Sequence, residues 1–130
     1  MTAEQDLDRA ASLLGPLEGR IMRLVWSGQA GEVFVVRDVQ ALMPELAYTT
    51  VMTTLRRLAE KGLLAARAEP GRRAHEYRVA QSPGSYLEAA SDREAGDVVA
   101  RYGDAALAAF AARLSGLSPE QRRQLEELAG

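Results

Sequence analysis

The residues of this chain best suited to binding chemistry lie on one face of a predicted helix, residues 48–64 (YTTVMTTLRRLAEKGLL). At 3.6 residues per turn, Thr49, Met52, Thr53 and Arg56 recur at i, i+3, i+4 and i+7. Short hydroxyl side chains can hydrogen-bond phosphates or base edges, and arginine can bind guanine through two hydrogen bonds. Helix stability alone does not account for four threonines within residues 49–54, because the branched Cβ of threonine lowers helix propensity. The composition is typical of a helix that contacts a nucleic acid.

The opposite side of the same helix is apolar. Val51, Leu55 and Leu58 recur there, with Thr54 beside them, and this spacing predicts a stripe that packs against a core. Residues on or next to the outer face form the candidate DNA-contacting set. This set is Tyr48, Thr49, Thr50, Met52, Thr53, Arg56 and Arg57.

The end of this helix is clearly marked, and its start has two interpretations. Gly62 fits the left-handed position that follows a helix, and Leu63 can fold back onto Leu58 in a Schellman contact. If Ala47 is the N-cap, no side chain caps the amides that follow, and these donors stay free for an anion such as a DNA phosphate. If Thr49 is the cap, the helix begins one turn later.

The composition excludes most classes of enzyme. The chain has no cysteine and a single histidine, so disulfides, thiolate metal sites and a cysteine nucleophile are excluded, and little remains for histidine catalysis or zinc. We expect no enzymatic activity, no cofactor and no metal. No apolar run reaches the roughly 18 residues of a membrane span, and the N-terminus is too acidic and polar for a signal peptide. We therefore expect a cytoplasmic protein without membrane insertion.

Charge is unevenly distributed, although the net charge is only −2. Residues 56–78 hold seven arginines or lysines and three glutamates, so this window is locally positive. Residues 82–130 hold eight acidic and five basic residues. A polyanion would therefore meet the first part of the chain and not the second.

The elements before the candidate helix predict a helix-turn-helix. Gly15, Pro16 and Glu18 fit the cap, first and third positions of a helix, with Glu18 able to reach back to the cap amide. That helix ends near Trp26, which we interpret as a core or domain-junction anchor, with ligand stacking as the lesser alternative. A short strand over residues 33–36, a helix over about residues 36–43 and a turn over residues 44–47 follow. The helix after this turn is then the reading helix.

A β-hairpin, or wing, is predicted directly after the reading helix. Residues 63–69 and 74–79 are strand-like and bracket the turn sequence PGRR. The tip brings Arg72 and Arg73 together, with His75 next along, and exposed guanidinium groups suit the minor groove or the phosphate backbone. The alternative is a solvated turn whose arginines have no partner. His75 is a candidate phosphate contact and not a metal ligand.

The last part of the chain predicts three helices that need a partner. Alanines and spaced leucines predominate there, and three short helices of this kind cannot bury enough surface alone. A second copy would supply the missing surface in a symmetric dimer, whereas the alternative is packing against the chain's own first domain. The candidate dimer core is Tyr86, Leu87, Val98, Val99, Tyr102, Leu107, Phe110, Leu114, Leu117, Leu125 and Leu128.

The predicted fold class is mainly α with a small β-hairpin. Residues 1–12 are predicted to be a flexible N-terminus, residues 13–80 a winged helix-turn-helix DNA-binding domain, and residues 81–130 a helical dimerisation domain. The expected partners are a double-stranded DNA operator and a second copy of the chain. Two other readings remain open: a regulator gated by a small molecule bound between the helical segment and the wing, and a winged-helix module that binds protein and no DNA.

These residues carry a family resemblance. The run LGPLEGRIMRLVW, followed by VRDV, LAYTTVMTTLRRLAEKGLL and HEYRV, resembles the BlaI/MecI family of penicillinase repressors over nearly the whole chain. The resemblance implies a dimeric winged-helix repressor of inverted-repeat operators, which controls genes for β-lactam resistance or cell-envelope functions. It also implies a membrane sensor protease upstream, which triggers cleavage in the C-terminal region. The resemblance gives the reading role to Thr49, Thr50, Met52, Thr53 and Arg56, and the wing role to Arg72 and Arg73.

Two departures from the family pattern bear on regulation. Copper-responsive members carry C-terminal cysteine pairs, and this chain has no cysteine, so metal sensing is unsupported. Staphylococcal-type members have an Asn-Phe bond in the penultimate helix, where this chain has Phe110 and Ala111. The cleavage event of those members is therefore not expected at this bond.

Overall fold

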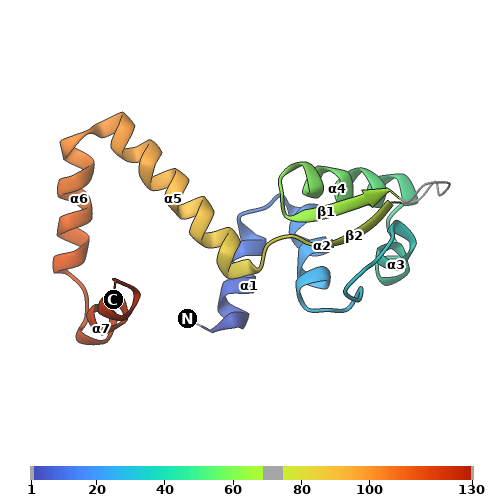
Figure 1. Ribbon diagram of the computed structural model, residues 1–130, viewed down its shortest axis with the longest axis horizontal. Coiled ribbons are helices and arrows are strands. Elements are labelled where there is room, and N and C mark those ends of the chain that lie inside the picture. The colour runs from blue at the N-terminus through green and yellow to red at the C-terminus, as the bar shows by residue number, and fades with distance from the viewer. Residues whose placement is uncertain (1, 69–74, 130) are drawn as a thin grey trace. The chain divides into compact units, whose positions relative to one another are not determined.

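The computed structural model describes residues 2–68 and 75–129, which are mainly helical with one antiparallel hairpin, as the sequence predicted. The elements are α1 (Ala3–Ser12), α2 (Pro16–Trp26), α3 (Val36–Leu42), α4 (Tyr48–Glu60), β1 (Leu64–Ala68), β2 (His75–Val79), α5 (Pro83–Tyr102), α6 (Asp104–Ser115) and α7 (Pro119–Ala129) (Figure 1). None of these helices is long and apolar enough to cross a membrane.

The chain divides into two compact units, Met1–Ala89 and Ala90–Gly130. The division falls within α5, whereas the sequence placed a boundary at residue 80. The reason is that the first turns of α5 belong to unit 1, where Tyr86 packs against the hydrophobic core. The ring of Tyr86 lies 6.4 Å from the ring of Trp26, measured between centroids.

The core of unit 1 is formed by α2, α3, α4 and the hairpin. Figure 1 shows α4 beside β1 and β2, with α2 and α3 close to them. The side chains that are fully buried include Ile21, Met22, Phe34, Val39, Val51, Leu55, Leu58 and Leu63. The apolar stripe predicted for α4 is thus confirmed, and Thr54 is buried with it.

Both ends of α4 follow from local sequence. Ala47 is the N-cap and provides no side-chain hydrogen bond, so the first interpretation of the helix start is the correct one. At the other end Gly62 has φ +80, which suits a residue without a Cβ. The Leu63 amide donates to the Leu58 carbonyl (3.0 Å), and the Gly62 amide donates to the Ala59 carbonyl (3.0 Å). This is the predicted Schellman arrangement.

The hairpin is held to the rest of unit 1 by Tyr77. β1 and β2 pair in antiparallel register from Leu64↔Val79 to Ala68↔His75. Tyr77 exchanges two backbone hydrogen bonds with Phe34 (3.0 and 2.8 Å), and the two rings stack with centroids 6.1 Å apart. Burial raises the pKa of the Tyr77 phenol, while the nearby Arg56 charge lowers it and Tyr48 raises it further.

The prediction of a strand over residues 33–36 is wrong, because this stretch forms only an isolated bridge, between Phe34 and Tyr77. The backbone leaves the extended conformation immediately afterwards, since α3 begins at Val36. The Val35 amide donates to the Asp38 carboxylate (2.9 Å), and this hydrogen bond fixes the start of the helix.

The N-terminal segment predicted to be flexible contains a helix, α1, of ten residues. Thr2 and Gln5 form a reciprocal capping box at its start. Ala10 and Ala11 are buried, and α1 packs on α2, where Asp8 forms an ion pair with Arg23. The sequence signal was weak because the buried face consists of alanines, which look neutral in a hydrophobicity pattern.

The sequence predicted that Glu18 reaches back to the cap amide of α2, and this prediction is wrong. Gly15 and Pro16 take the predicted cap and first positions, but no side chain caps the helix. Instead the Glu18 carboxylate accepts from Lys61 Nζ at 2.7 Å. A charged partner at the end of α4 outcompetes a local amide.

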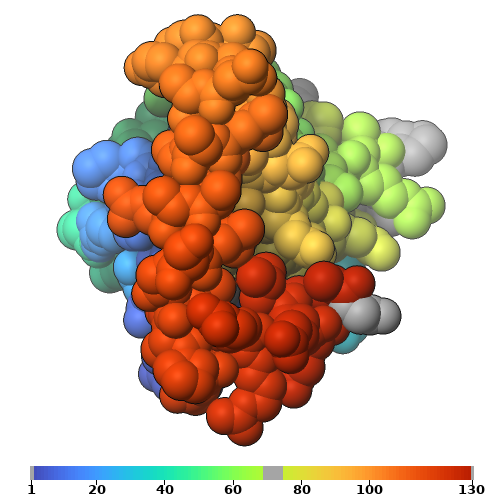
Figure 2. All heavy atoms as spheres, turned by 90° about the vertical axis from the view of Figure 1, so that its left-hand side faces the viewer, coloured from blue at the N-terminus to red at the C-terminus, as the bar shows by residue number. Residues whose placement is uncertain are grey.

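Unit 2 buries few of its side chains. Ala90 and Ala106 are its only buried residues within the described part of the chain. Gly103, with φ +60, separates α5 from α6 and is the N-cap of α6, so α6 begins at Asp104. Ser118 and Gln121 form a capping box at the start of α7, with hydrogen bonds of 3.0 and 3.1 Å. α6 and α7 face the viewer in Figure 2.

The contact between α1 and α2 generates a stability prediction. A Cβ added at Gly19 would lie 2.6 Å from the Ala11 carbonyl oxygen, so Gly19→Ala must push the two helices apart. We expect the free energy of unfolding to fall by about 1–3 kcal/mol. Gly96 in α5 is the matched control, because its added Cβ meets nothing within 4 Å. Gly96→Ala should raise stability by up to about 1 kcal/mol through helix propensity. Urea unfolding followed by circular dichroism measures both, and equal effects would contradict the close helix contact.

The raised pKa of Tyr77 predicts an alkaline loss of stability. The folded state holds this proton more tightly than the unfolded chain, so the contribution is fully present below about pH 10 and is lost as pH rises through the raised folded pKa. Tyr77→Phe removes this titration. Relative to the parent, the variant should therefore gain unfolding free energy between about pH 9 and about pH 11 in urea titrations. A Tyr77→Phe protein that loses as much unfolding free energy over this pH range as the parent would contradict the prediction.

Candidate nucleic-acid interface

The outer face of α4 is presented to solvent, as the helical spacing predicted. Thr49, Thr53, Arg56 and Arg57 are exposed, and Tyr48 is 39% exposed. Thr50 and Met52 are half-buried, and Met52 also packs against the core. Arg56 and Arg57 form no ion pair within the described residues. The face therefore combines free guanidinium groups with short hydroxyl side chains.

The hydroxyl groups of α4 lie along a shallow hollow. It has a volume of about 280 Å³ and is lined by Leu17 of α2 and by Thr49, Thr50, Thr53, Thr54 and Arg57 of α4. The Thr54 hydroxyl donates to the Thr50 carbonyl (2.7 Å) and is therefore not available to a ligand. The remaining three threonines are the groups that an incoming base edge or phosphate can reach.

A second hollow adjoins the start of α4 and adds a residue that the sequence reasoning missed. It has a volume of about 570 Å³ and is lined by Arg37, Gln40, Ala41, Pro44 and Tyr48. Arg37 is exposed and has no ion pair within the described residues. Gln40 instead supports the turn, because its Nε2 donates to the Leu46 carbonyl (3.4 Å). The sequence signal that could have identified Arg37 is the presence of an arginine in the helix before the turn.

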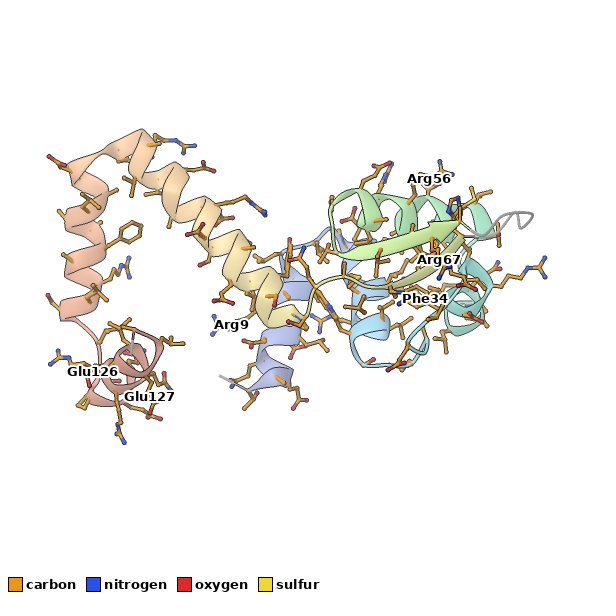
Figure 3. All side chains as sticks on the ribbon, viewed as in Figure 1. Arg9, Phe34, Arg56, Arg67, Glu126 and Glu127 are labelled. Atoms are coloured by element: carbon orange, nitrogen blue, oxygen red, sulfur yellow. The ribbon has the colours of Figure 1, made fainter. Side chains whose placement is uncertain are left out.

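The hairpin carries further basic residues. Figure 3 shows Arg67 on β1 and Arg56 on α4 towards the same end of unit 1. Arg67 pairs in register with Glu76, and Arg78 with Ala65. The wing-tip residues Arg72 and Arg73 lie outside the described residues. His75 begins β2, is exposed, and has its ring 6.4 Å from that of Tyr77.

The predicted dimer residues fall in both units. Tyr86 and Leu87 are half-buried in unit 1, where Tyr86 contacts Trp26. Val98, Val99 and Leu117 are half-buried in unit 2. The large apolar side chains exposed in unit 2 are Tyr102, Leu107, Phe110, Leu114, Leu125 and Leu128, with exposed fractions from 40% to 86%.

No group of three or more His, Cys, Asp or Glu side chains that could hold a metal occurs in the part of the chain that the structure describes. The arrangement offers hydrogen-bond donors and positive charge on a helix face, and these groups bind phosphates and base edges. Such a face can contact a polyanion.

No curated protein matches this chain. Two solved structures are similar over most of their length. One is a point mutant of MepR from a multidrug-resistant S. aureus clinical isolate, at 18% identity and TM-score 0.46, covering 97% of this chain and 86% of that chain. The other is a mutant of MarR from E. coli complexed with operator DNA, at 13% identity and TM-score 0.46, covering 98% of this chain and 82% of that chain.

A family model described as penicillinase repressor matches residues 14–130. The match includes α4, the hairpin and the C-terminal helices, and it leaves out α1. The chain therefore belongs to the penicillinase repressor family, whose members are DNA-binding transcriptional repressors and not enzymes.

Proposed function

We propose that the chain represses transcription as a homodimer that occupies an inverted-repeat operator, with α4 in the major groove. The observation that carries this proposal is the two-sided character of α4. Its apolar stripe is fully buried, which leaves on the outer face three threonines and two arginines that form no ion pair with any described residue. The family resemblance supports genes for β-lactam resistance or cell-envelope functions as targets.

The basic residues and the threonines have different roles in this proposal. Arg56 and Arg57, with Arg72 and Arg73 of the wing, contact phosphates and supply much of the salt-dependent affinity. Arg37 extends this set from α3, across the hollow that adjoins Tyr48. Thr49, Thr50, Met52 and Thr53 contact base edges and supply much of the sequence preference. His75 is a further phosphate contact.

A second copy of the chain completes unit 2. Its described helices bury only two alanines but expose several leucines and a phenylalanine. Contiguous exposed apolar side chains mark an interaction surface. A symmetric pair buries the same patch on both copies and sets two reading helices roughly 34 Å apart, which is one turn of DNA.

Release from the operator follows an upstream signal in this proposal. The family resemblance supports a sensor-protease pathway. Phe110, which stands where the staphylococcal-type members have the cleaved asparagine, is 40% exposed on α6. The changed sequence of this pair favours a release mechanism other than cleavage at that bond.

The two roles of the α4 residues can be separated by substitution. Arg57→Ala should weaken binding to operator and scrambled DNA alike and reduce the salt slope by about one. Thr53→Ala should weaken operator binding by about tenfold while leaving scrambled DNA unchanged. Fluorescence anisotropy on the DNA upstream of its own gene, at two salt concentrations, measures both quantities.

Arg9→Ala is the charge control, because Arg9 lies on α1 and has no ion pair within the described residues. It should leave affinity and salt slope unchanged. Equal losses on operator and scrambled DNA for both α4 variants would reject the division of roles.

The dimer surface can be tested with two leucines of similar exposure. Leu107 on α6 is 54% exposed and Leu13 after α1 is 56% exposed. Leu107→Lys should shift the chain from dimer to monomer in analytical ultracentrifugation and weaken operator binding, because a buried unpaired charge is costly. Leu13→Lys should change neither. A parent protein that sediments as a monomer when bound to the operator would overturn the dimer proposal.

A further inference from the structure

Unit 1 contains a pocket that is lined by none of the outer-face residues of α4. It has a volume of about 470 Å³ and lies between the start of α1, Trp26 at the end of α2, and the start of α5. This volume falls within the usual range of small-molecule sites, about 300–1,000 Å³. The pocket depends on α1, which lies outside the residues that the family model matches.

Asp6 places an unsatisfied acceptor at this pocket. Its Oδ1 atom is buried and receives no hydrogen bond from the described residues. Its Oδ2 atom would lie 3.5 Å from a Cβ built at Gly84, so the carboxylate rests against the first turn of α5. The N-terminal end of a helix favours this negative charge. A buried acceptor without a donor is costly, and a ligand N–H group would remove that cost.

The rest of the lining suits a cation with an apolar body. Trp26 supplies an indole ring, which is held in place because its Nε1 donates to the Gln81 carbonyl (2.9 Å). Leu7 adds an apolar wall and Glu4 a second carboxylate. No lysine, arginine or histidine is among the described residues that line the pocket. An indole attracts cations as well as planar groups. We infer that the pocket binds an organic cation, an ammonium or amidinium group on a planar apolar body, as an effector of DNA binding.

Gln81 connects this pocket to the DNA-contacting helix. Its backbone carbonyl accepts from Trp26, and its side-chain Nε2 donates to the Gly62 carbonyl (2.8 Å) at the end of α4. A ligand that moves the indole therefore acts on the residue that holds the C-terminal end of α4. The effector role rests on the proposed DNA binding, whereas the site itself does not.

Trp26 is the only tryptophan in the chain, so its fluorescence reports on the pocket directly. The probe is biphenyl-4-carboxamidine, with the neutral biphenyl-4-carboxamide as its isostere, added to the full chain without DNA. The amidine should change the emission with saturation, and the amide should bind at least about tenfold more weakly. Equal binding of the two compounds, or no saturable change with the amidine, would overturn the site.

Two variants locate the binding within the pocket. Asp6→Asn keeps the shape and removes the charge, so amidine affinity should fall about tenfold or more. Glu88→Gln is the control, because Glu88 is exposed on α5 and does not line the pocket, so this variant should leave amidine affinity unchanged. Ala3→Phe, at the pocket rim, should block the amidine without a change of charge. Circular dichroism melts verify that each variant is folded, and unchanged amidine affinity in a folded Asp6→Asn protein would overturn the assignment.

A separate titration tests the effector role. Operator affinity measured by anisotropy should change in saturating amidine for the parent and stay constant for Asp6→Asn. Saturable amidine binding with unaltered operator affinity would overturn the effector role and retain the site. A chain that binds the amidine but not the operator would instead overturn the proposed function, so the two failures are distinguishable.

Discussion

Burial of the apolar stripe of α4 is the constraint on which the rest of unit 1 depends. Val51, Leu55 and Leu58 are fully buried, and each such side chain contributes about 1.5–3 kcal/mol relative to exposure. A rotation of the helix by one residue would expose this stripe and bury a charged residue such as Arg56. The rotation of α4 is therefore fixed by packing, and the positions of its threonines and arginines follow from it. The Schellman turn at Gly62 and the hydrogen bond from Gln81 fix the helix end in the same way.

Features of the fold with local causes were predictable from sequence, and features that depend on distant contacts were not. The extent of α4 follows from helical spacing and one glycine. The docking of α1 depends on Gly19, whose missing side chain admits the Ala11 carbonyl of another helix. Likewise, Glu18 has a local partner available in the cap amide of α2, but in the folded chain it binds Lys61, which is distant in the sequence. The strand predicted near Phe34 is an exception, because it is absent for a local reason: the hydrogen bond from Val35 to Asp38 starts α3 there.

The residues of the candidate site also divide into those that local sequence predicts and those that depend on contacts between distant elements. Thr49, Thr53, Arg56 and Arg57 could be assigned from spacing alone, because all of them lie on one helix. Arg37 could not, since its place beside Tyr48 requires knowledge of how α3 packs on α4. The pocket beside Trp26 could not be predicted from the sequence either, because residues from three separate elements line it.

The exposed apolar side chains of unit 2 couple oligomerisation to DNA binding in the proposed mechanism. A unit that buries two alanines and exposes several leucines gains stability from a partner, and this gain depends on protein concentration. An inverted-repeat operator presents two half-sites, so binding of one reading helix raises the effective concentration of the other. Dimer formation and operator occupancy then reinforce each other. A small change in either equilibrium produces a larger change in repression, and an effector needs only a modest coupling energy to release the operator.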